Sequence, residues 1–148
     1  MKPSARIQAA IDVMEAITVR HQPAGLALAD WGKSHRFTGS GDRAAIGNVV
    51  YDALRHRALS AYHMRGDTPR ALVLGALHTA RELDVAAIEA LCDASQHAPA
   101  ALTGDERARL TGGIHSGAAD WQWRMCRNGS RRIFPRCSAS NWWPKGMR

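Results

Sequence analysis

The sequence lacks the signature motifs of common catalytic and membrane-bound proteins. Its 148 residues contain no GxGxxG run, no P-loop, no HExxH and no paired CxxC, so no complete motif for a dinucleotide, nucleotide or zinc site is present. No apolar run reaches the roughly 20 residues that a membrane-spanning helix needs. The first residues also lack the basic-then-apolar pattern of a signal peptide. We therefore expect a soluble protein without a membrane partner.

Cysteine is scarce, and histidine shows no metal-site pattern. Three cysteines without regular spacing exclude a disulfide framework and favour a reducing compartment, so we expect a cytoplasmic protein. Cys92 falls on an apolar helix face, which predicts a place in the core. His56 and His63 are seven residues apart, but no thiol or carboxylate is spaced to complete a site, so no metal ion is expected.

Positive charge is concentrated at one end of the chain. The formal net charge is +7. Residues 120–148 hold seven basic residues and one acidic residue, whereas residues 1–119 hold 13 basic and 12 acidic ones. An interpretation of the whole chain as a basic, nucleic-acid-binding protein would therefore rest almost entirely on its last 29 residues.

The first 115 residues show the apolar period of helices. The pattern predicts a first helix over residues 4–21 with Ser4 as its N-cap, and a second helix over residues 25–33. A Gly/Ser turn over residues 38–42 precedes a long third helix, capped by Ser40 or Asp42, that runs to the break at residues 66–69.

Three shorter helices are expected after that break. Asp67 or Thr68 can cap the fourth helix, with Pro69 in its first turn, where the missing N–H costs nothing. A fifth helix covers residues 85–92, and the spacing of Thr103 and Glu106 is that of a capping box opening a sixth. No segment alternates with the period of a strand. About six helices with short connections predict an all-α bundle.

Two glycines lie inside predicted helices. Gly47 and Gly75 each cost roughly 1 kcal/mol relative to alanine at such positions. A close approach of neighbouring helix backbones would explain them, and tolerated exposure would explain them equally well. The sequence leaves both interpretations open.

One stretch resembles a known family signature. The run Arg-Phe-Thr-Gly-Ser-Gly-Asp-Arg over residues 36–43 leads into a helix that ends in Leu-Arg-His-Arg over residues 54–57. This arrangement resembles the NusB-like N-terminal domain of the RsmB/NOP-type RNA (cytosine-5) methyltransferases. Residues 3–12 and the Thr-Pro-Arg-Ala run over residues 68–71 fit the same pattern. The resemblance covers about residues 1–115.

The resemblance implies a NusB-like helical domain over residues 1–115 that binds RNA. Full-length family members are S-adenosylmethionine-dependent ribosomal RNA methyltransferases, with the cofactor and catalytic cysteines in a separate Rossmann-like domain. That domain is not recognised in this chain, and Cys126 and Cys137 lack the family's flanking residues. The expected function is therefore RNA binding without a catalytic residue, a cofactor site or methyltransferase activity of its own.

Basic residues along the predicted third helix and around it are the candidate RNA contacts. Positions 43 and 57 are about four helical turns apart and would share a face, and arginine can donate two hydrogen bonds to one phosphate. The alternative is a solvated face on which Asp42 and Asp52 act as local counter-charges. The candidate residues are Arg36, Arg43, Arg55, Arg57 and Arg65.

The last segment, residues 116–148, is predicted to be an irregular basic tail. Its arginine, tryptophan, serine and cysteine are typical of GC-rich DNA translated in a wrong frame. A shift of two nucleotides from within Met125 permits a Val-Pro-Glu-Trp-Leu stretch, which resembles the continuation of the family. We therefore expect a chain truncated by a frameshift near residue 120.

Two alternatives to this interpretation stay open, as does the oligomeric state. In the first, the tail is genuine: Arg131 and Arg132 bind phosphates while Trp142 and Trp143 stack on unpaired bases. The protein would then be a stand-alone NusB-like RNA-binding or antitermination-type factor. In the second, the chain is a helical interaction module without a nucleic-acid role.

Overall fold

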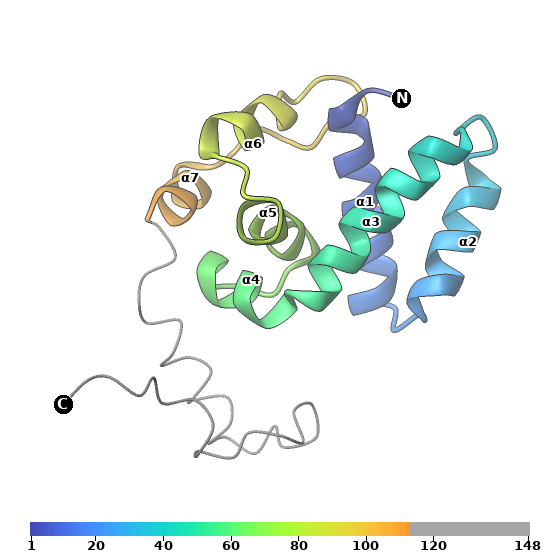
Figure 1. Ribbon diagram of the computed structural model, residues 1–148, viewed down its shortest axis with the longest axis horizontal. Helices are drawn as coiled ribbons and strands as arrows, with labels where there is room; N and C mark the ends of the chain where they lie inside the picture. Colours follow the sequence, from blue (N-terminus) through green and yellow to red (C-terminus); the bar gives the residue numbers. More distant parts are fainter. Residues whose placement is uncertain (113–148) are drawn as a thin grey trace, which may run out of the picture. The chain divides into compact units, whose positions relative to one another are not determined.

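The computed structural model describes residues 1–112, which form seven helices and contain no strand. The all-α prediction is confirmed for this part of the chain, which Figure 1 shows as a bundle of short helices. The expected irregular tail lies outside the described residues. The helices are α1 (Pro3–Thr18), α2 (Ala24–Ser34), α3 (Ser40–Arg55), α4 (Arg57–Met64), α5 (Pro69–Thr79), α6 (Val85–Leu91) and α7 (Gly104–Thr111).

Helix α5 is the centre of the bundle. It packs against α1, α3, α4 and α6, and Figure 1 shows it nearly end-on among them. Every residue from Ala71 to Leu77 is buried, which explains why this helix is apolar on all sides. Helix α2 packs against α1 at the far edge of the bundle. Cys92 is buried in the same core, as predicted.

Side-chain caps fix the starts of the later helices. The Thr68 hydroxyl accepts a hydrogen bond from the Ala71 N–H at 3.2 Å, with Pro69 following as the first helical residue. Thr103 and Glu106 form the predicted capping box of α7 through bonds of 3.2 and 3.0 Å. Each cap of this kind stabilises its helix by about 1 kcal/mol. These sequence predictions are confirmed.

The predicted caps of the earlier helices are wrong. Helix α1 begins at Pro3, one residue before Ser4, because proline without an N–H suits the first helical position. Ser4 is therefore buried inside the first turn. Helix α3 begins at Ser40 with no side-chain cap, and Asp42 bonds to distant partners instead. Helix α1 also ends at Thr18, before the predicted end at His21, whose backbone has φ 55°.

The expected long third helix is two helices. Helix α3 ends at Arg55, His56 adopts φ −102° and ψ 18°, and α4 begins at Arg57. The apolar pattern continues across this bend, so the sequence period gave no sign of it. The bend gives α4 a direction of its own and lets it pack along α5, its main neighbour in the bundle.

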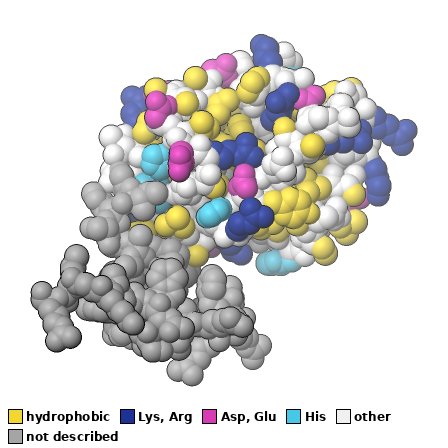
Figure 2. Space-filling view, in the orientation of Figure 1, with side chains coloured by type: hydrophobic (Ala, Val, Ile, Leu, Met, Phe, Trp, Pro, Cys, Tyr) yellow, Lys and Arg dark blue, Asp and Glu magenta, His cyan; other side chains and the backbone are white. Residues whose placement is uncertain are grey.

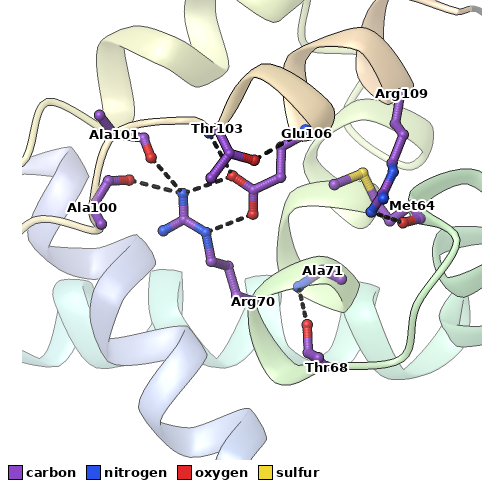
Figure 3. A network of polar contacts seen from close by, with 9 residues as sticks. All are labelled: Met64, Thr68, Arg70, Ala71, Ala100, Ala101, Thr103, Glu106 and Arg109. Carbon is purple, nitrogen blue, oxygen red and sulfur yellow. Dashed lines mark hydrogen bonds and ion pairs between the residues drawn. The ribbon is translucent and has the colours of Figure 1, made fainter.

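A polar network attaches α7 and the loop before it to α5 (Figure 3). Arg70 Nε donates to Glu106 Oε1 at 2.8 Å, and Arg70 Nη2 donates to Glu106 Oε2 at 3.2 Å. The same Nη2 donates to the carbonyl oxygens of Ala100 and Ala101. Arg109 donates to the Met64 carbonyl at 2.9 Å and so ties α7 to the end of α4. The α6–α7 loop is therefore held in one place by Arg70.

The charges of this network reinforce each other. Partial burial of Glu106 would raise its pKa, but the hydrogen bonds and charge of Arg70, with the bond from Thr103, hold the pKa of Glu106 below its ordinary value. The hydrogen bond to Glu106 correspondingly raises the pKa of Arg70 against the opposing effect of burial. Arg70 belongs to the Thr-Pro-Arg-Ala run of the resemblance, and its role in this fold is structural.

Candidate functional site

All five predicted RNA-contact arginines are exposed. Arg36 lies in the turn between α2 and α3, and Arg43 lies near the start of α3. The other three lie around α4. Arg55 ends α3, Arg57 begins α4, and Arg65 follows α4 in a left-handed conformation with φ 50°.

The spacing argument that placed Arg43 and Arg57 on one helix face is wrong. The bend at His56 puts the two residues on different helices, so a count of helical turns no longer relates their directions. The arginines instead form two groups, Arg36 and Arg43 near the start of α3 and Arg55, Arg57 and Arg65 at the two ends of α4. Arg43 and Arg55 are twelve residues apart on α3, which corresponds to about 18 Å of helical rise.

The first group, Arg36 and Arg43, has no carboxylate partner within residues 1–112. Asp42, the expected counter-charge, binds Arg6 at 2.7 Å and the N-terminal ammonium at 3.3 Å. Desolvation opposes ionisation of Asp42, yet the hydrogen bonds from these two cations hold its pKa below the ordinary value. Because its charge is already compensated, Asp42 does not neutralise this arginine pair.

The second group, Arg55, Arg57 and Arg65, is partly compensated. Asp52 accepts a hydrogen bond from Arg81 Nε at 3.0 Å, and its other carboxylate oxygen lies 3.7 Å from Arg55 Nη1. One carboxylate therefore pairs with two arginines. Arg57 and Arg65 form no ion pair in the described part of the chain. Asp52 is therefore a local counter-charge for Arg55, as expected, whereas Asp42 acts on Arg6 rather than on Arg43.

The surface around the first group is the more basic one on the visible face. Figure 2 shows Lys and Arg side chains gathered at the right-hand edge, over α2 and the start of α3. Over the rest of this face, basic, acidic and apolar side chains are interspersed. Lys33 lies in α2 as well, although Asp30 binds it at 3.0 Å. The α2–α3 edge is therefore the best electrostatic candidate for an anionic partner.

An aromatic cluster lies beside Arg36, and sequence reasoning missed its role. Phe37 is 82% exposed, and its ring meets that of His35 edge-on with centroids 5.8 Å apart. His35 stacks on Trp31 with centroids 4.3 Å apart. The sequence signal for this cluster was an arginine next to a phenylalanine just before the Gly/Ser turn. Trp31 is partly buried, and Tyr51 of α3 is 47% exposed.

The aromatic cluster forms one wall of an open groove of about 610 Å³. Helix α1 contributes Ala5 and Ala9 to its lining, and the α6–α7 loop contributes Gln96 and His97. Segments distant in the sequence therefore meet around one surface hollow.

Chemical machinery is not evident in residues 1–112. No group of three or more histidine, cysteine or acidic side chains there is placed to hold a metal ion. Burial raises the pKa of the Cys92 thiol, which keeps it in its unreactive protonated form. No helix in this region has the length and apolar character needed to cross a bilayer. Cys126 and Cys137 lie outside the described residues.

Comparison of the chain with protein-family models, with curated protein sequences and with solved structures finds no match. The resemblance to the NusB-like domain therefore depends on the residues of the sequence itself. The arginines and the groove must be interpreted from their own chemistry.

Proposed function

We propose that this chain binds RNA through the exposed arginines of its helical body, as a NusB-like N-terminal domain of a ribosomal RNA (cytosine-5) methyltransferase would. The observation that supports this most is the pair Arg36 and Arg43. Both side chains are exposed at the α2–α3 edge, and the neighbouring Asp42 is already bound by Arg6. An uncompensated guanidinium pair on a nearly neutral body suits a phosphate backbone.

The proposal assigns binding, not chemistry, to this chain. S-adenosylmethionine and the catalytic cysteine of the family belong to a domain that the sequence does not resemble, so no residue here is assigned to either. RNA would be held by phosphate contacts, which fix position and carry no base information by themselves. The second group, Arg55, Arg57 and Arg65, would extend the same contact to the other end of α3.

The test compares two exposed arginines, Arg43 at the α2–α3 edge and Arg20 in the turn after α1. Arg43→Ala and Arg20→Ala each remove one exposed guanidinium that forms no ion pair within residues 1–112. Binding of a labelled RNA hairpin is followed by fluorescence anisotropy from 50 to 200 mM salt. Arg43→Ala should weaken binding severalfold and lower the salt slope by about one, as loss of a single phosphate contact does.

The control decides what the first variant means. Arg20→Ala, in the turn after α1, should leave both the affinity and the salt slope nearly unchanged. Equal effects of the two variants would show that only the total charge matters, and the α2–α3 edge would lose its assignment. If the full chain binds no RNA at low salt, the proposal is wrong and a protein-interaction module becomes the better interpretation.

A second candidate function is favoured by the charge distribution. Residues 120–148 carry seven basic residues and one acidic residue. This positive charge would suit a stand-alone factor that binds RNA through its tail. Sequencing the coding DNA past codon 148 tests the origin of that tail. Continuation of the neighbouring frame into a Pro-Glu-Trp-Leu stretch and a cofactor domain would support a frameshift, and early closure of both other frames would support a genuine tail.

A further inference from the structure

The groove beside Arg36 has an aromatic wall that the phosphate contacts leave unused. Trp31, His35 and Phe37 follow one another in ring contact from the core to the surface. His35 Nδ1 lies 2.9 Å from the Trp31 carbonyl oxygen, and because that oxygen can only accept, Nδ1 carries the proton. The His35 ring is thus fixed in orientation. Phe37, at the outer end, keeps most of its ring in water.

One hydrogen-bond donor of the groove is not satisfied by the described part of the chain. Trp31 lines the groove on the α2 side, and its Nε1 is buried and has no hydrogen-bond partner within residues 1–112. Buried polar atoms are nearly always paired, and the indole N–H can only donate. A ligand with an acceptor atom on a flat ring would supply the missing partner.

One cation lines the groove, and a second follows its aromatic wall in the sequence. Lys2 lines the groove and forms no ion pair within the described residues, although it interacts electrostatically with Asp93. Arg36 stands between His35 and Phe37 in the sequence, is exposed and forms no ion pair there either. Asp12 also lines the groove and keeps its negative charge, because the Gln8 amide that donates to it at 2.8 Å is neutral. A ligand with a flat ring in the groove and phosphates near Lys2 and Arg36 would match this arrangement.

We propose that this groove binds an unpaired base of single-stranded RNA, which stacks on Phe37 while its flanking phosphates contact Lys2 and Arg36. This inference rests on the proposed function and specifies the form of RNA that the chain takes. Free phosphate would leave the aromatic wall unused, and an apolar peptide would leave the two cations unused. Stacking on an aromatic face suits any base, so the site discriminates single strands from duplexes rather than one base from another.

The experiment measures binding of the full chain to two labelled oligomers of equal length. One is an eight-residue oligoadenylate, and the other is the same ribose-phosphate backbone without bases. Phe37→Ala should weaken binding of the oligoadenylate about fivefold or more, the effect of losing one stacked base, and should leave binding of the abasic strand unchanged. Phe37→Trp should restore oligoadenylate binding. Because Phe37 is exposed, its substitution should leave the fold intact, and circular dichroism of each variant checks this.

A control on α2, the helix that precedes Phe37, separates stacking from general apolar contact. Leu26 of α2 is 48% exposed and does not line the groove, so Leu26→Ala should change neither affinity. If Phe37→Ala weakens both oligomers equally or neither of them, the base site is wrong while RNA binding stands. If the unaltered chain binds neither oligomer even at low salt, the proposed function fails together with this inference.

Discussion

Gly75 of α5 lies directly against Ser60 of α4. A Cβ atom at position 75 would come within 2.7 Å of Ser60 Cβ and 2.9 Å of Ser60 Cα. Ser60 is fully buried, so it has no room to retreat. Of the two interpretations that the sequence left open, close backbone approach is therefore the correct one for Gly75. For Gly47 the nearest atom to an added Cβ is Leu28 Cδ1 at 3.9 Å, which is an ordinary contact.

These distances predict opposite effects for the same substitution at the two glycines. Gly75→Ala should lower the free energy of unfolding by about 1–2 kcal/mol, because the strain of overpacking exceeds the gain in helix propensity. Gly47→Ala should raise it by up to about 1 kcal/mol, because only the propensity gain remains. Urea denaturation followed by circular dichroism measures both. A stabilising Gly75→Ala variant would contradict the close packing of α4 on α5.

The sequence predicted features governed by local chemistry. The Thr68 cap, the Thr103–Glu106 capping box and the burial of Cys92 depend on short-range patterns, and the structure confirms each of them. The bend at His56 was missed because neither a proline nor a change of period marks it. It is stabilised by tertiary packing of α4 on α5, which no local pattern reports.

The candidate site likewise has features that local sequence predicts and features that depend on tertiary packing. Exposure of Arg43, Arg55 and Arg57 followed from their place on polar helix faces, and Arg36 and Arg65 are exposed in the segments between helices. Their grouping did not, because it depends on the bend at His56 and on the capture of Asp42 by Arg6 from another helix. The groove could not be predicted either, because it depends on contacts between segments far apart in the sequence. Phe37 and Gln96 line it together, although 59 residues separate them in the sequence.

The ion pair of Arg70 and Glu106 should make stability depend on pH. The pKa of Glu106 in the folded protein lies below its ordinary value of 4.5, so its contribution is complete above about pH 4.5 and is lost as the pH falls through the folded pKa. Glu106→Gln should cost about 1–2 kcal/mol at pH 7, because it removes a charge-assisted bidentate pair. The difference from the unaltered protein should shrink as the pH falls below 4.5.

Glu89 is the matched control for Glu106, because it pairs with Arg107 at the surface. Its side chain is 46% exposed, compared with 15% for Glu106, so solvent screens the pair. Glu89→Gln should change stability by less than about 0.5 kcal/mol at any pH. Thermal unfolding of both variants at pH 7 and pH 3.5 provides the comparison. A pH-independent loss in Glu106→Gln would mean that Glu106 acts through packing alone.

Deletion of residues 120–148 distinguishes the two candidate RNA-binding surfaces. The deletion removes seven basic residues and one acidic residue, so the affinity for RNA at low salt should fall and the salt slope should become smaller whichever surface is specific. If the helical body carries the site, the shortened chain keeps a salt-dependent affinity with a slope of at most about 4, set by its five arginines. That residual binding should weaken severalfold further in Arg43→Ala and remain unchanged in Arg20→Ala. A shortened chain that melts like the full chain and binds no RNA would transfer the function to the tail, because its folded body would then have been tested intact and found insufficient.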